Sequence, residues 1–345
     1  IYGLIRINDF DPSKLYKQKD MLHVGLIQPN INPWEKWRTD GIEQVYLYKH
    51  LQDSLMQFFP NLDLTIWAET AVPGISITVN QQHFYPFLTD WINKHKTSLL
   101  TGFSEYYIYP KADQAPSTAR VWFGDSSRLW EPFNSALLLN PAPYDSKNPQ
   151  LYRKSRLTPF AERFPYSDKL TFAQSWLKWG VGISAWGIGR GAYPLEINRN
   201  GKKALTGNII CIESIYPDFV ADFVRKGAQM LTVITNDAWY DHTVGPRQHY
   251  LIAAMRAVET RRYIARVGNT GVTGFITPTG RSRQEAEQYK STAIAGAIYL
   301  LDDISLYVKY GDWLPKLSFV LSLVLIIVCA FFFRKDKTKN NNVKE

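Results

Sequence analysis

Cysteine is nearly absent from this chain, which holds only Cys211 and Cys329 among 345 residues. So few thiols exclude a disulfide framework and any metal site built on cysteine. Cys329 lies in a long apolar run near the C-terminus, and Cys211 stands alone in the rest of the sequence. A free cysteine often packs as a small hydrophobic side chain, so a chemical role for Cys211 needs support from other residues.

The chain also lacks a stripe of Lys and Arg with interleaved aromatic residues, although its formal net charge is +9. Proteins that bind along a phosphate backbone carry such a stripe, so nucleic-acid binding is not expected. Part of the positive charge lies after Phe333, where the tail has five basic and two acidic residues. No segment recurs at the spacing of solenoid repeats, which favours one globular unit.

One apolar run is nearly long enough, as a helix, to cross a lipid bilayer. Residues 317–333 contain no charged side chain, and at ~1.5 Å per residue a helix of this length approaches the thickness of a bilayer. With Trp313 at the headgroup level, we predict a transmembrane helix over 313–333; the alternative is a buried core helix. The basic tail, 334–345, then lies in the cytoplasm and the larger part of the chain on the opposite, periplasmic side of a bacterial inner membrane.

The chain begins at Ile1, with neither an initiator methionine nor a signal peptide. We therefore expect residues 1–20 to be a connecting segment from a preceding membrane region, and 21–312 to be the globular domain. Within that domain strands alternate with helices, which predicts an α/β fold. The expected helices cover 32–59, 82–95, 216–228 and 249–265; the expected strands include 22–28, 62–69, 97–105, 204–214, 229–237 and 292–300.

The segment 175–191, "SWLKWGVGISAWGIGRG", shows neither the apolar spacing of a helix nor the alternation of a strand, and it mixes three tryptophans with five glycines. It is either an ordinary loop with buried indoles or an apolar flap beside a lipid-binding site.

Three polar residues follow or interrupt predicted strands: Glu69, Lys154 and Cys211. Ligands of open α/β sheets bind at the carboxyl ends of strands, so these side chains are expected to converge. A thiol becomes nucleophilic if its pKa falls or a base takes its proton, and a helix N-terminus after Cys211 would favour the anion. Together with the Ile212 amide as an oxyanion donor, a carboxylate and an ammonium complete a set for acyl transfer.

Alternatives remain from the residues alone. Glu69 fits a helix cap, Lys154 a solvated loop and Cys211 a core position. Cysteine–histidine catalysis would need His242 or His249, which are seven residues apart, and nothing else near them completes a metal-ligand set.

The segments "WAETAVPG", "YRKSRLTPFAERFP", "CIES" and "TNDAWY…GPRQH…MRAVETRRYIARVGNTGVTGFITPTG" resemble the nitrilase superfamily. They resemble most closely its bacterial membrane branch, the apolipoprotein N-acyltransferases, from about Leu22 to Leu300. This resemblance implies an α-β-β-α sandwich and a Glu–Lys–Cys triad, with no metal or cofactor.

The resemblance also implies residue roles. Glu69 would be the general base, Lys154 the oxyanion-stabilising cation and Cys211 the nucleophile. The supporting carboxylates would be Glu162 and Glu213, the pocket aromatics Trp37 and Trp239, and 175–191 a mobile loop over the site. Three positions depart from the family pattern, namely Ala68, Ala161 and Ile212, where proline, glycine and tyrosine are usual; only a side-chain role of that tyrosine is affected.

The expected activity is transfer of a fatty acyl chain from a membrane phospholipid, through a cysteine thioester, to the N-terminal amine of a diacylglyceryl-cysteine lipoprotein. We expect a membrane-bound monomer whose partners are these two lipid substrates. Two alternatives are a membrane-tethered amidase or hydrolase that uses water as acceptor, and a non-catalytic lipoprotein-binding module.

Overall fold

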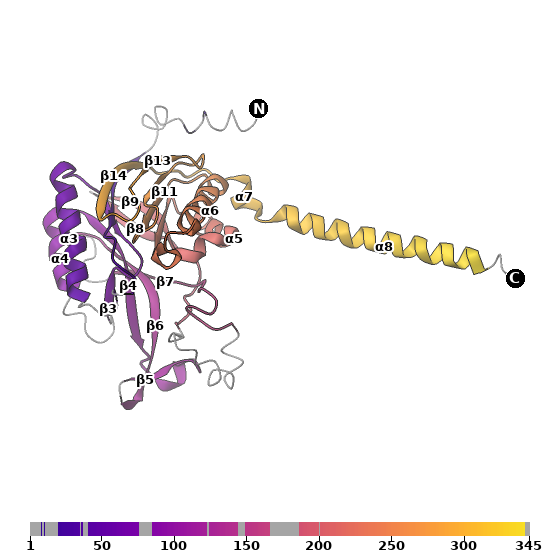
Figure 1. Cartoon of the computed structure of the whole chain (residues 1–345), viewed down its shortest axis with the longest axis horizontal. Helices are drawn as coiled ribbons and strands as arrows, with labels where there is room; N and C mark the ends of the chain where they lie inside the picture. Colours follow the sequence, from indigo (N-terminus) through magenta and orange to yellow (C-terminus); the bar gives the residue numbers. More distant parts are fainter. Residues whose placement is uncertain are drawn as a thin grey trace.

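The computed structural model describes residues 8, 10, 20–34, 36, 41–75, 85–122, 124–143, 149–165, 186–199 and 201–341. Two sheets form the centre of the domain (Figure 1). The first has the order β14-β1-β2-β4-β6-β5, with β3 on β4 and β7 on β6. Its strands are β1 (Met21–Gln28), β2 (Leu64–Trp67), β3 (Val72–Ile75), β4 (Ser98–Ile108), β5 (Arg120–Trp122), β6 (Asp125–Leu139), β7 (Gln150–Arg153) and β14 (Thr292–Tyr299).

The second sheet has the order β13-β12-β11-β10-β9-β8. Its strands are β8 (Leu195–Arg199), β9 (Lys202–Ile210), β10 (Met230–Thr235), β11 (Ile264–Gly268), β12 (Gly274–Ile276) and β13 (Ser282–Glu285). In both sheets the central strands are parallel: β1, β2 and β4 in the first, and β9, β10 and β11 in the second. Strands of this kind are covered on both faces, which explains why β2, β10 and β11 are buried throughout.

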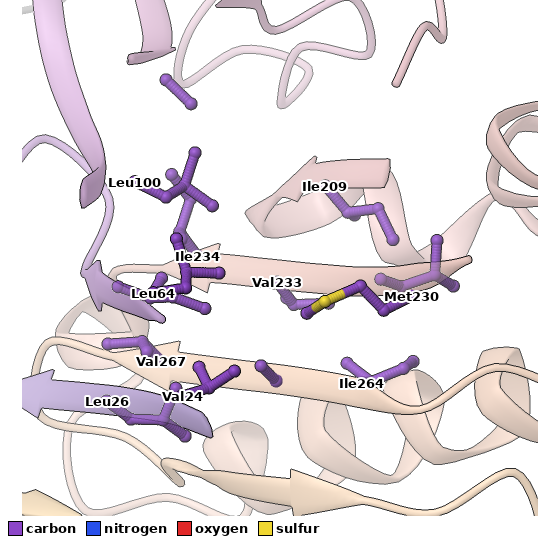
Figure 2. Packing of buried hydrophobic residues seen from close by; sticks show 14 of the residues in the cluster. Val24, Leu26, Leu64, Leu100, Ile209, Met230, Val233, Ile234, Ile264 and Val267 are labelled. Carbon is purple, nitrogen blue, oxygen red and sulfur yellow. The ribbon is translucent and has the colours of Figure 1, made fainter. Parts of the chain in front are cut away.

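The hydrophobic core lies between the two sheets. Figure 2 shows side chains of the first sheet, such as Leu26 and Leu64, beside Ile234 and Val267 of the second, and all four are fully buried. Helices α3 (Gly41–Phe58) and α4 (Tyr85–His95) lie outside the first sheet, and α5 (Pro217–Arg225) and α6 (Gly245–Thr260) outside the second (Figure 1). The predicted α-β-β-α sandwich is confirmed.

Several predicted boundaries are wrong. The first long helix begins at Gly41 and not at residue 32, because residues 33 and 34 form a turn. Helix α6 begins four residues before its predicted start, with Pro246 in the first turn, where a missing N–H costs no hydrogen bond. It ends at Thr260 because Arg261 adopts a left-handed conformation, so Ile264 and Ala265 belong to strand β11.

The C-terminal helix α8 (Trp313–Asn341) follows the short α7 (Leu306–Tyr310) and projects away from the sandwich (Figure 1). Its segment Trp313–Phe332 has a mean hydropathy of 2.4 and is exposed along its length. Within the described residues it is the one helix long and apolar enough to cross a bilayer. The helix continues past residue 333, where the sequence predicted the tail to begin.

Candidate active site

Lys154 follows strand β7 and is buried between two carboxylates. Its Nζ lies 3.3 Å from Glu69 Oε1 and 2.9 Å from Glu162. Burial alone would lower the pKa of Lys154, but the charges of Glu69 and Glu162 raise it above the ordinary lysine value. The ammonium group therefore stays charged. The same charge overcomes the effect of burial on Glu162 and lowers the pKa of that carboxyl.

Asn134, on β6, joins the two carboxylates and was not singled out from the sequence. Its Nδ2 donates to Glu69 Oε1 at 2.7 Å and to Glu162 Oε1 at 2.8 Å, and its backbone carbonyl accepts from the Lys154 amide at 2.8 Å. The amide of Asn236 donates to Glu69 Oε2 at 2.8 Å. Both carboxylate oxygens of Glu69 are thus held in place by hydrogen bonds. The one sign of Asn134's role in the sequence is that a polar asparagine lies within a largely apolar strand.

Cys211 begins a 3₁₀ turn, η3 (Cys211–Ile215), directly after β9, and has a φ of 50°. Few non-glycine residues adopt this left-handed conformation, and such strain is common at functional sites. Burial and the charge of Glu69 raise the pKa of Cys211 to about 12, although Lys154 opposes the increase and Thr235 forms a hydrogen bond with the thiol. The prediction that a helix N-terminus lowers this pKa is wrong, since helix α5 begins only at Pro217. The resting group is a thiol, and it needs a base.

Glu213 lies in the same turn, and its carboxylate is held by backbone amides. It accepts hydrogen bonds from the amides of Ile210 at 2.9 Å and Ser155 at 2.8 Å, and from the Tyr152 hydroxyl at 2.8 Å. Burial raises its pKa despite these donors. Glu213 therefore connects the turn that carries Cys211 to the segment that carries Lys154, and its position fits a supporting role. Ile212 lies in this turn directly after Cys211, and its side chain is partly buried.

Lys36 is a second buried lysine at the site, and it was not singled out from the sequence. Its Nζ donates to the carbonyl of Glu69 at 3.0 Å and to Thr70 Oγ1 at 2.7 Å. Burial lowers its pKa to about 8, against the opposing effect of Glu69. Gly102 packs on the other side of the same turn, where a Cβ would lie 2.6 Å from the Thr70 amide nitrogen. Together these contacts fix the backbone that presents Glu69.

Exposed aromatic side chains lie near this polar cluster. Trp239, in the turn η4 (Asp237–Tyr240), makes an edge-to-face contact with Trp34 at 5.3 Å between ring centroids. Both indoles are more than half exposed. Tyr240 lies within electrostatic range of Cys211. The predicted pocket residue Trp37 and the larger part of the predicted flap, 175–185, lie outside the described residues.

His249, on α6, lies beside the turn that begins with Cys211. Its Nδ1 lies 2.8 Å from Asp237 Oδ1, and its Nε2 lies 2.9 Å from Ser214 Oγ and 3.1 Å from the carbonyl oxygen of Cys211. Asp237 also pairs with the buried Arg266 at 2.7 Å, and this charge lowers its pKa although burial would raise it. His249 thus contacts the backbone of Cys211, so we expect it to position this turn rather than to act as the base.

If Cys211 reacts as the expected nucleophile, replacing His249 with glutamine should slow that reaction about 10- to 100-fold by loosening the strained turn, as a small displacement of a reacting group does. KM and the pH at which the thiol is alkylated should remain as in the wild type. Steady-state kinetics and alkylation by iodoacetamide across pH measure both. A shifted alkylation profile would contradict this role and restore the cysteine–histidine hypothesis.

The two-sheet sandwich and this cluster define a known class of protein. Residues 23–298 match the model of the carbon-nitrogen hydrolase family, and the chain belongs to that family. Solved structures with the same fold include Nit3 of Saccharomyces cerevisiae, a member of branch 10 of the nitrilase superfamily, with a TM-score of 0.57 and 17% identity over 81% of this chain and 90% of that one. An amidase from Nesterenkonia sp. aligns with a TM-score of 0.55 and 14% identity over 86% of this chain and 96% of the other.

Among curated proteins the chain is similar to apolipoprotein N-acyltransferases. The protein of that name from Chlorobaculum tepidum is 36% identical over 319 residues, which are 90% of this chain and 57% of that protein. The one from Bdellovibrio bacteriovorus is 28% identical over 84% of this chain and 51% of that protein. The chain therefore spans about half the length of these curated relatives. The resemblance that the sequence motifs indicated is confirmed.

Proposed function

We propose that this protein transfers a fatty acyl chain from a membrane phospholipid to the N-terminal amine of a diacylglyceryl-cysteine lipoprotein, through a thioester on Cys211. One observation carries the proposal: Glu69, Lys154 and Cys211, which are far apart in the sequence, meet in one cluster, in which Glu69 and Lys154 are buried and Cys211 is partly buried. The names of the relatives support lipoprotein N-acylation as the general activity.

In the first half-reaction, Glu69 takes the proton of the Cys211 thiol, and the sulfur attacks the ester carbonyl of the phospholipid. The carbonyl oxygen becomes an anion, which Lys154 and the amide of Ile212 stabilise. The ester C–O bond then breaks, and Glu69 returns its proton to the departing lysophospholipid oxygen. The acyl chain remains on sulfur.

In the second half-reaction, the amine of the lipoprotein attacks the thioester and passes a proton to Glu69. The C–S bond breaks, the amide is released, and Glu69 reprotonates the sulfur. Because one acyl-enzyme joins two half-reactions, the kinetics should be ping-pong. Glu162 holds Lys154, and Glu213 holds the turn η3, which begins with Cys211. Trp239 and Trp37 belong to the lipid pocket.

The membrane location is inferred from α8, which we propose crosses the bacterial inner membrane with residues 334–345 in the cytoplasm and the catalytic domain in the periplasm. A lipid-embedded donor and acceptor explain why the domain carries such an anchor. We propose that the protein acts as a monomer.

Intact-mass spectrometry of the detergent-purified protein, incubated with phospholipid, tests this function. We expect a mass increase of one fatty acyl chain that hydroxylamine removes and that maps to Cys211, and Cys211→Ser should carry no thioester. A thioester-linked acyl chain in Cys211→Ser would overturn the assignment of the nucleophile. An adduct with a small amide or ester, but none with phospholipid, would favour the hydrolase alternative; no adduct with either would favour a binding module.

A further inference from the structure

Helix α6 exposes an apolar stripe where a helix facing water would expose polar side chains. Beyond its first turn, its exposed residues are Leu251, Met255 and Val258, and 51%, 57% and 38% of their surfaces are accessible. Spacings of four and three residues place them on one face of the helix. The neighbouring helix α5 differs, since it exposes the charged Asp218 and Arg225. The apolar stripe thus distinguishes α6 from its neighbour.

The stripe leads toward the base of the membrane helix. Ser305, the N-cap of α7, donates to the carbonyl of Glu259 at the C-terminal end of α6, which fixes the two helices end to end. Beyond this contact, exposed apolar residues recur up to the first turn of α8, interrupted by the exposed Asp302, Asp303 and Lys309: Ile304, Leu306, Tyr310, Trp313 and Leu314. An extended exposed apolar surface of this kind marks an interaction site.

We infer that this α6–α7 surface, formed by the α6 stripe and the exposed apolar residues from Ile304 to Leu314, rests on the lipid at the headgroup–acyl boundary. The inference rests on the proposed membrane anchoring by α8. The link to α8 identifies the occupant, because α6 is joined through α7 to a helix whose apolar length is exposed and fits a bilayer. The aromatic neighbours Tyr310 and Trp313 are of the type that sits at this depth.

Docking of this surface orients the site toward its substrates. Arg256, on α6, donates to the carbonyls of Ser214 and Ile215, which belong to the turn that begins with Cys211. The lipid-facing helix and the nucleophile turn are therefore one packed unit, and α6 also carries His249. Contact of α6 with lipid would hold Cys211 at a fixed height above the bilayer. The ester of a phospholipid would then have to move only a short distance out of the bilayer to reach the thiol.

Fluorescence quenching in the reconstituted full chain tests this. In a background in which Cys211 and Cys329 are alanine, the variants Met255→Cys and, as a control, Gln57→Cys are labelled with nitrobenzoxadiazole. Gln57 is exposed near the end of α3, on the side of the sandwich opposite α8 (Figure 1). In vesicles of phosphatidylethanolamine and phosphatidylglycerol, brominated acyl chains should quench the label at position 255 and aqueous iodide should not. The label at position 57 should show the reverse.

A third variant separates this inference from the proposed anchoring. The native Cys329, exposed on α8, is labelled in a Cys211→Ala background. Quenching of that label by bromolipid, together with iodide access at position 255, would overturn docking while leaving the anchor intact. Absence of quenching at Cys329 would overturn the anchor itself. A label at 255 that neither reagent reaches, or that self-quenches as protein density rises, would show that protein covers α6 and would also overturn lipid docking.

Discussion

Replacing Lys154 with methionine is expected to have the largest effect on this protein. Removal of an oxyanion-stabilising group costs about 10²–10³-fold in rate. The same change leaves the buried Glu69 and the partly buried Glu162 without their shared cation. Breaking a buried ion pair in this way destabilises a protein by about 3–5 kcal/mol. Acyl-enzyme formation and denaturant unfolding in detergent measure the two effects.

Two further variants keep this prediction testable if Lys154→Met folds poorly. Lys154→Arg retains the charge, so stability should largely survive, but the planar guanidinium does not fit between two carboxylates as the ammonium does, and acylation should remain slow. Lys203→Met is the matched control, because Lys203 pairs with Glu196 at the surface, and such pairs contribute about 0–1 kcal/mol. If Lys203→Met and Lys154→Met destabilise the protein equally, the contacts of Lys154 with Glu69 and Glu162 do not contribute the expected free energy of unfolding.

Replacing Glu69 with glutamine should lower the rate of acylation of Cys211 by about 10²–10⁴-fold, since general base catalysis contributes that much. The variant should also change the thiol. The charge of Glu69 raises the pKa of Cys211 and that of Lys154 lowers it. With the carboxylate neutralised and the ammonium retained, the pKa of Cys211 must fall below its wild-type value of about 12.

The pH dependence of alkylation by iodoacetamide therefore shifts to lower pH in Glu69→Gln while acyl transfer declines. Glu285→Gln is the control, because Glu285 pairs with Arg247 on the exposed surface. It should change neither measurement. An unchanged alkylation profile in Glu69→Gln would show that its carboxylate does not act on the thiol, and the role of Glu69 as base would fail.

Local patterns in the sequence were sufficient for much of the fold. Continuous apolar runs predict buried parallel strands, and strands β1, β2, β4 and β10 lie where such runs occur. The apolar run before the basic tail predicts α8 from composition alone. Helix ends were predicted less well, because the turn at 33–34 and the left-handed Arg261 depend on contacts that the spacing of apolar residues along a helix does not reveal.

The candidate reactive groups can be read from the sequence: a lone thiol after one strand, a carboxylate after another and a lysine after a third. Their meeting in one site depends on how distant segments fold together. Glu69 and Lys154 are 85 residues apart, and Asn134, Lys36 and His249 join their cluster from other elements. Burial and neighbouring charge set the pKa of Cys211, and both arise only when distant segments pack together, because desolvation depends on everything that surrounds a group and not on its neighbours in the chain.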